Sequence, residues 1–147
     1  MPQGKPQPGE EQDMTTRPIV QSARFKAPPE VLFELYMDSK KHSEATGGRA
    51  KMSPKAGPFT AYDGQLSGHN LVIVPGKMIV QAWRAEHWPA SDPDSILILT
   101  FSKAKGGGQV DLVHVNVPGH DHEGVKLGWP EYYWKRWRKY LASKARG

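Results

Sequence analysis

The residues of this sequence that are best suited to chemistry are histidines with polar or acidic neighbours, which occur in two places. The first is the run His120-Asp121-His122-Glu123, in which imidazole and carboxylate groups are suitable metal ligands. The four residues are consecutive, however, and no second ligand pair follows at a recognisable spacing. We therefore expect no metal and no cofactor, and we interpret Asp121 as a residue at the N-terminus of a helix.

The second place is a predicted strand that carries His114 and Asn116. Both alternate with valines, so that they share one face of the strand with Val110 and Leu112. If this face lines a cavity, His114 could hydrogen-bond a ligand carbonyl or carboxylate near neutral pH. A strand with a solvated polar face shows the same alternation, and the sequence leaves both interpretations open.

Nucleophilic catalysis finds no support in the residue types and their spacing. The sequence contains no cysteine, which excludes a thiolate nucleophile, a sulfur-ligated zinc and a disulfide, and suits a reducing compartment. No serine lies in a Gly-x-Ser-x-Gly turn, and the glycines at 106–108 lack the Lys-Ser/Thr that follows a phosphate-binding loop. These features favour a binding protein over an enzyme.

Length and composition indicate one domain behind a polar tail. The chain has 147 residues, about the size of a single domain. Residues 1–17 carry few apolar side chains, so we expect them to be disordered and residues 18–147 to form the domain. No apolar run resembles a signal peptide or is long enough to span a bilayer, and we expect a cytoplasmic protein without membrane insertion.

The formal net charge of +5 raises the question of an acidic partner such as nucleic acid. The basic residues are spread along the chain, with one cluster between Lys135 and Arg146. Cations at this position also complement the C-terminal end of a helix dipole. Because basic and aromatic residues do not interleave on a predicted strand pair, nucleic-acid binding is the weaker interpretation.

Turn signals and periodicity define the elements that would position these residues. A short strand that begins near Pro18 and carries Ile19, Val20 and Phe25 ends at Ala27-Pro28-Pro29. Two short helices are predicted over 30–38 and 39–46. Beyond Gly47-Gly48, apolar runs alternate with turn signals, which is typical of antiparallel hairpins. The predicted strands cover 49–54, 58–63, 65–74, 77–87, 95–103 and 108–117.

The C-terminal segment returns to helical periodicity. At helical spacing, one face carries Trp129, Tyr133, Trp137, Tyr140 and Leu141. We predict a helix over about 130–143 that starts or kinks at Pro130, because proline removes a backbone donor, with an irregular turn before it from about 122. The predicted fold is α+β with a helix-grip arrangement, in which a curved antiparallel sheet of six to seven strands wraps around this long helix.

The space between sheet and helix would form either a filled core or a ligand cavity. Trp83 shares one face of its predicted strand with Gln81 and Ile79, and we expect this face to point at the helix. Such residues fit ordinary core packing as well as a cavity lining. The residues that would line a cavity are Phe59, Tyr62, Leu71, Gln81, Trp83, His114, Trp129, Tyr133 and Trp137.

An ordered set of short motifs resembles one protein family. The motifs are Phe25-Lys-Ala-Pro-Pro-Glu, Asp63-Gly64 with Gly68, Val74-Pro75, Ile79-Val80-Gln81-Ala82-Trp83-Arg84, Trp88-Pro89, and Gly128-Trp129 followed by Tyr132-Tyr133-Trp134. Over about residues 18–143 the chain thus resembles the C-terminal domain of the heat-shock protein 90 ATPase activators, within the START-like (Bet v I-like, SRPBCC) superfamily. The resemblance implies a helix-grip fold and docking on the N-terminal ATPase domains of the chaperone.

The resemblance covers one domain of the full activators. The first 17 residues are too few for the separate N-terminal domain with which those proteins engage the chaperone, so stimulation of ATP hydrolysis is not implied. We expect a single-domain, chaperone-associated stress-response protein whose partners are a heat-shock chaperone, a small apolar ligand, or both. The alternative is a cyclase- or hydrolase-like enzyme that uses polar residues of the same cavity.

Overall fold

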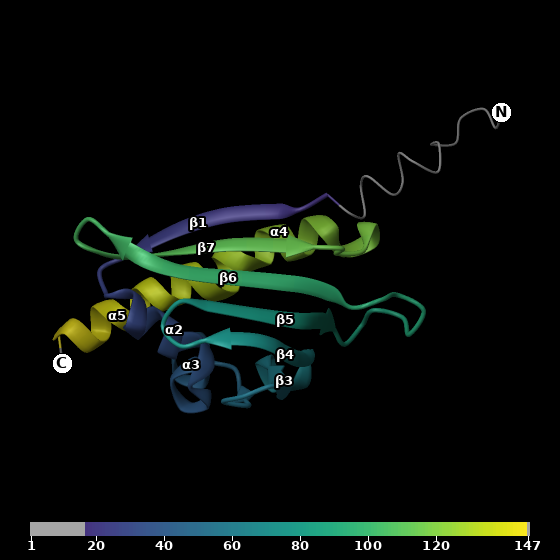
Figure 1. Cartoon of the computed structure of the whole chain (residues 1–147), viewed down its shortest axis with the longest axis horizontal. Coiled ribbons are helices and arrows are strands. Elements are labelled where there is room, and N and C mark those ends of the chain that lie inside the picture. The colour runs from purple at the N-terminus through teal and green to yellow at the C-terminus, as the bar shows by residue number, and fades with distance from the viewer. Residues whose placement is uncertain (1–16, 147) are drawn as a thin grey trace.

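The computed structural model describes residues 17–146, which form a seven-stranded antiparallel sheet crossed on one face by a long C-terminal helix (Figure 1). The strand order is β1-β7-β6-β5-β4-β3-β2, so that the first strand pairs with the last and the others follow one another as hairpins. The strands are β1 (Ile19–Phe25), β2 (Lys51–Met52), β3 (Gly57–Ala61), β4 (Leu66–Val74), β5 (Met78–Ala85), β6 (Ser95–Ala104) and β7 (Gly107–Val115). This arrangement confirms the predicted fold class. The tail predicted over 1–17 lies, apart from Arg17, outside the described residues.

Two short helices connect β1 to β2, as predicted. α2 (Pro29–Met37) has proline at its first position, where the missing N–H costs nothing. The Asp38 carboxylate accepts a hydrogen bond from Lys41 N and thereby starts α3 (Ser39–Thr46), which ends at Gly47. Within residues 17–146, none of the helices combines the length and the apolar character that a membrane crossing requires.

Alternation along the strands separates an inner from an outer face of the sheet. In β5 the side chains of Ile79, Gln81 and Trp83 point inward and are buried. The C-terminal helix covers this inner face, and the ring centroids of Trp83 and Trp129 lie 6.1 Å apart. The predicted aromatic ridge of the helix is therefore the centre of the core. Its residues Trp129, Tyr133 and Trp137 are almost completely buried, and Tyr140 and Leu141 at its end are partly buried.

The C-terminal helix begins at His122, where the sequence predicted an irregular turn before a helix from about 130. It consists of α4 (His122–Trp129), a π-helical turn (Pro130–Trp134) and α5 (Lys135–Arg146), so that it passes through the proline. The predicted start was wrong because the chain accommodates Pro130 inside the helix, in the π turn.

A side chain from β1 compensates for the proline. Pro130 offers no N–H to the carbonyl of Lys126, and Gln21 Nε2 donates to that oxygen instead, at 2.8 Å. The amide oxygen of Gln21 accepts a hydrogen bond from Trp134 Nε1 at 2.9 Å. One glutamine thus satisfies a carbonyl that precedes the π turn and an indole N–H of the last residue of that turn.

We expect Gln21→Leu to lower the free energy of unfolding by about 1–3 kcal/mol, because two polar groups lose their partner. Urea unfolding followed by tryptophan fluorescence measures the loss. Gln109→Leu is the matched control, since Gln109 hydrogen-bonds Arg24 and Asp111 on the outer face. Equal losses in the two variants would contradict a special role for Gln21 at the π turn.

Candidate functional site

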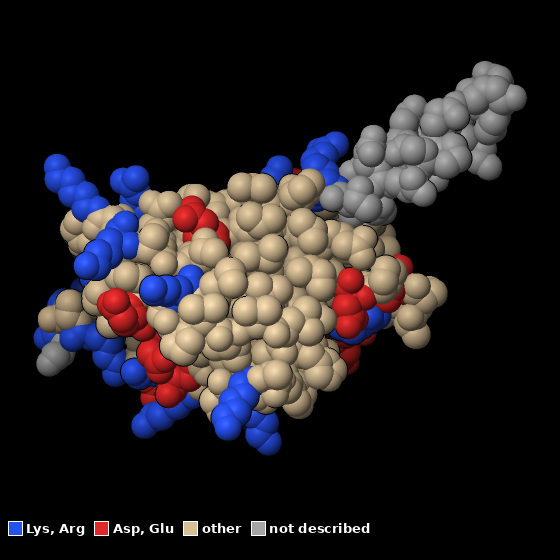
Figure 2. Space-filling model, viewed as in Figure 1, with Lys and Arg blue, Asp and Glu red and all other residues tan. Residues whose placement is uncertain are grey.

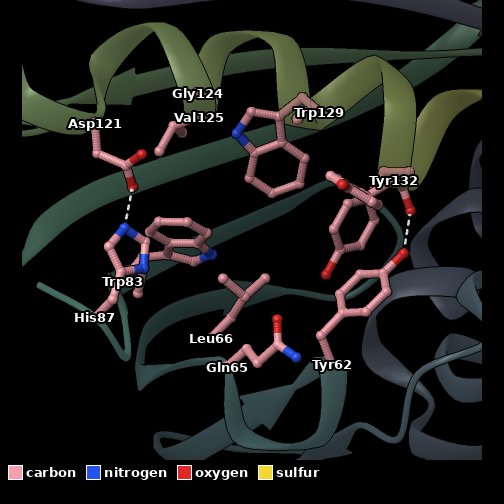
Figure 3. A pocket seen from close by; sticks show the side chains of 13 residues that line it. Tyr62, Gln65, Leu66, Trp83, His87, Asp121, Gly124, Val125, Trp129 and Tyr132 are labelled. Atoms are coloured by element: carbon pink, nitrogen blue, oxygen red, sulfur yellow. Dashed lines mark hydrogen bonds and ion pairs between the residues drawn. The ribbon is translucent and has the colours of Figure 1, made fainter.

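A pocket of about 300 Å³ lies between the inner face of the sheet and the first half of the C-terminal helix (Figure 3). Leu66 of β4 and Trp83 of β5 form one wall, and Val125 and Trp129 of α4 form the opposite wall. Gln65 lies at its rim. The lining is therefore mainly aromatic and aliphatic, which is typical of a small-molecule site.

Small residues leave this space open. Gly124 and Gly128 lie one turn apart on α4 and both line the pocket, as does Ala85 on the opposite wall. A Cβ atom on Gly124 would lie 2.8 Å from Asp121 Oδ1, whereas one on Gly128 would meet the ring of Tyr132 only at 3.6 Å. Of the two glycines, Gly128 is thus the one with room for a Cβ atom.

The structure brings part of the predicted cavity lining together. Tyr62, Trp83, Trp129 and Tyr133 line the pocket. Gln81 accepts a hydrogen bond from Tyr36 OH at 2.7 Å and donates one to Asn70 Oδ1 at 2.8 Å, so its polar groups serve the core. The predicted lining residues that point inward but are buried in the core behind the pocket are Phe59, Gln81, His114 and Trp137.

His114 points inward, but both of its ring nitrogens contact protein groups. Trp129 Nε1 can only donate, so His114 Nδ1 accepts from it at 3.2 Å and His114 Nε2 donates to Ser95 Oγ at 2.8 Å. Burial, with a smaller contribution from His122, lowers the pKa of His114 to about 3, and the ring is neutral at pH 7. His114 therefore does not line the pocket as predicted, and instead it holds Trp129 from behind the pocket wall.

Asn116, the second polar residue predicted on the same strand face, does not accompany His114 inward. It follows the end of β7 and has a positive φ of 62°, so the strand alternation stops before it. Its Nδ2 donates to Asp94 O at 3.3 Å. The predicted polar pair is therefore not formed.

Leu71, also predicted to line the cavity, is 51% exposed and lies outside the pocket. Strand pairing steps from Asn70 with Gln81 to Val72 with Val80, which leaves Leu71 as the extra residue of a β-bulge. The inward position belongs to Asn70, which is buried. The predicted alternation fails here because an inserted residue leaves no signal in an apolar run.

Two residues at the rim form a pair that the sequence did not predict. Asp121 is the N-cap residue of α4, as predicted, but its side chain makes no capping hydrogen bond. Its Oδ2 accepts from Trp88 Nε1 at 2.7 Å and lies 3.2 Å from His87 Nε2 (Figure 3). His87 and Asp121 are far apart in the sequence, so only the folded chain brings them together.

The two histidines of the 120–123 run point in different directions. His120 Nε2 pairs with Asp92 Oδ2 at 2.6 Å, and His122 Nε2 donates to Arg17 O at 3.0 Å. Within residues 17–146, no group of three or more His, Cys, Asp or Glu is arranged to hold a metal ion.

The hydroxyls of Tyr62 and Tyr133 beside the pocket donate to protein acceptors. His42 Nδ1 donates to the Tyr36 carbonyl at 2.8 Å, so His42 Nε2 accepts from Tyr133 OH at 3.0 Å. Burial lowers the pKa of His42 to about 4 and raises the pKa of Tyr133. Tyr62 OH donates to the Tyr132 carbonyl at 2.5 Å. These groups shape the pocket without offering a free donor.

The outer face of the sheet is a second candidate surface. Directly paired positions on five strands carry an outer apolar row, formed by Val72, Val80, Ile98, Val113 and Val20. Figure 2 shows this face, with the Lys, Arg, Asp and Glu side chains of the described residues gathered mainly toward its margins. An antiparallel sheet with one solvated face usually carries polar residues there, so this outer apolar row is a candidate contact surface.

The chain matches one protein family over most of its length. Residues 26–142 match the family described as "Activator of Hsp90 ATPase homolog 1-like protein". The chain is 29% identical over 112 residues to the "Activator of 90 kDa heat shock protein ATPase homolog 1" of Homo sapiens, covering 76% of this chain and 33% of that protein. It is 26% identical over 117 residues to the corresponding homolog of Dictyostelium discoideum, covering 78% and 30%. The chain thus spans about a third of the length of these curated relatives.

Solved structures share the fold. An HSP90 activator from Plasmodium falciparum has a TM-score of 0.78 and 24% identity, covering 85% of this chain and 96% of that one. A protein from Mesorhizobium loti has a TM-score of 0.73 and 19% identity, covering 86% and 98%. Together with the match over residues 26–142, the sequence and fold place this chain in the Activator of Hsp90 ATPase homolog 1-like protein family.

Proposed function

We propose that this domain is a chaperone-associated binding protein that docks on an Hsp90-type chaperone through the outer apolar row. Membership of the family supports the partner, because curated relatives are named as activators of a 90 kDa heat shock protein ATPase. The observation that carries the docking surface is the row itself, since Val20 is 69% exposed and Val72 is 43% exposed.

Polar positions flank the outer apolar row on the same face. Asp111 lies two residues before Val113 on β7, and Arg84 lies four residues after Val80 on β5. An apolar centre with a polar rim is the usual anatomy of a protein–protein interface. This arrangement supports docking of a folded partner on the sheet.

We expect Val72→Glu to weaken binding to the homologous Hsp90-type chaperone at least about tenfold, because it places a charge in the apolar contact. Calorimetric titration with and without ATP measures the affinity. Leu127→Glu is the matched control, since Leu127 is 58% exposed on α4 and outside the row. If the wild type does not bind the chaperone at tens of micromolar, the proposal of an Hsp90-type partner is contradicted. If both variants weaken binding equally, the assignment of the outer apolar row as the docking surface is contradicted.

The pocket supports a second binding function, for a small apolar ligand. Its walls are mainly aromatic and aliphatic, and the hydroxyls of Tyr62 and Tyr133 already donate to protein acceptors. The enzyme alternative would rely on His87 and Asp121 at the rim. Asp121 also accepts a hydrogen bond from the Trp88 indole N–H, which favours a structural role for this carboxylate. We therefore favour the binding function over hydrolysis or cyclisation.

A further inference from the structure

One buried donor at the pocket has no acceptor. The indole N–H groups of Trp129 and Trp88 donate to His114 and Asp121. Trp83 is 4% exposed, and its Nε1 has no hydrogen-bond partner within residues 17–146. Figure 3 shows the nitrogen-bearing edge of Trp83 turned toward the middle of the pocket. A buried donor without an acceptor is unfavourable, so a bound molecule that supplies an acceptor gains affinity.

Trp137 provides an internal comparison. Its Nε1 also lacks a partner in the described part of the chain, but Trp137 does not line the pocket. The rings of Phe25, Tyr133 and Trp134 surround it in the core. Of these two indoles, Trp83 is therefore the one that lies beside the pocket.

The shape and charge of the pocket define the rest of the ligand. Tyr62, Trp129 and Tyr133 present aromatic rings, which favour a ring-shaped apolar body. Among the described lining residues Asp121 is acidic and none is Lys or Arg, which disfavours an anionic ligand. Arg136 lies over the ring of Tyr62 and is not part of the lining.

We propose that the pocket binds a neutral, ring-containing molecule with a carbonyl oxygen, and that Trp83 Nε1 donates a hydrogen bond to that oxygen. This inference rests on the binding function proposed for the pocket and adds the chemical class of the ligand. It also assigns Trp83 as the residue that selects carbonyl compounds over hydrocarbons of the same shape.

Three naphthalene probes test the proposal: acetylnaphthalene, ethylnaphthalene and the naphthoate anion. The ratio of the Kd of ethylnaphthalene to that of acetylnaphthalene should be about tenfold higher in the wild type than in Trp83→Phe, which keeps an aromatic ring but lacks the N–H. Trp137→Phe is the matched control and should leave the ratio unchanged. Naphthoate should bind more weakly than acetylnaphthalene, and Asp121→Asn should reduce that difference.

A measurement on the wild type keeps the test independent of the folding of any variant. Among the indole N–H resonances in a nitrogen-15 correlation spectrum, that of Trp83 should shift more with acetylnaphthalene than with ethylnaphthalene. Similar shifts with both probes, or the same Kd ratio in Trp83→Phe, would overturn the carbonyl selectivity and leave an apolar pocket function intact. Failure of all three probes to bind would overturn the pocket function itself.

Discussion

Acidification from pH 7 to about pH 4.5 is expected to lower the free energy of unfolding by roughly 4–5 kcal/mol through two buried histidines. Burial holds the pKa of His42 at about 4 and that of His114 at about 3. In the unfolded chain both imidazoles return to a pKa near 6.5, so below that pH the unfolded state binds more protons than the folded state. Stability therefore falls as pH drops from about 6.5 toward the folded-state pKa values.

Urea unfolding at a series of pH values measures the slope of the free energy of unfolding against pH. His114→Gln should remove roughly half of this slope, whatever stability the variant loses at pH 7. The double variant with His42→Gln should lose most of the remaining slope. His69→Gln is the matched control, because His69 is exposed on β4. A double variant that keeps the full slope would assign the acid sensitivity to carboxylates instead.

The fold was predictable because strand and helix periods are local. Alternation in β5 and the helical spacing of Trp129 and Trp137 are both present in the structure. Two of the departures arise from single residues that break a period. Leu71 is inserted as a bulge, and Pro130 is accommodated in a π turn because Gln21, distant in the sequence, supplies the missing donor.

The candidate site was less predictable because its chemistry depends on partners from distant segments. His114 faces inward as one interpretation allowed, yet Trp129 and Ser95 occupy both of its nitrogens. The unpartnered N–H of Trp83 is defined only by the absence of an acceptor among the described residues, which no sequence pattern records. The sequence allowed aromatic residues to be assigned to the space between sheet and helix. It did not indicate which of their polar groups lack a hydrogen-bond partner.

Gly68→Ala is expected to destabilise the domain by about 4 kcal/mol or more, because the added atom would overlap backbone. Gly68 lies between Phe59 and Trp83 in the strand register. A Cβ atom there would lie 2.7 Å from the carbonyl carbon of Ala82 and closer still to its oxygen. Since both atoms belong to β5, relief requires β4 and β5 to separate, and Trp83 would move with them.

Gly106→Ala is the matched control, because it measures the loss of stability on replacing a glycine where no atoms overlap. Gly106 has a φ of 79°, but a Cβ atom there would meet nothing within 4 Å, so we expect a loss of only about 1 kcal/mol. Urea unfolding compares the two variants, and acetylnaphthalene titration reports on the pocket. If Gly68→Ala loses no more stability than Gly106→Ala, β4 and β5 can adjust without strain. If it is destabilised but still binds the probe like the wild type, the position of Trp83 does not depend on Gly68.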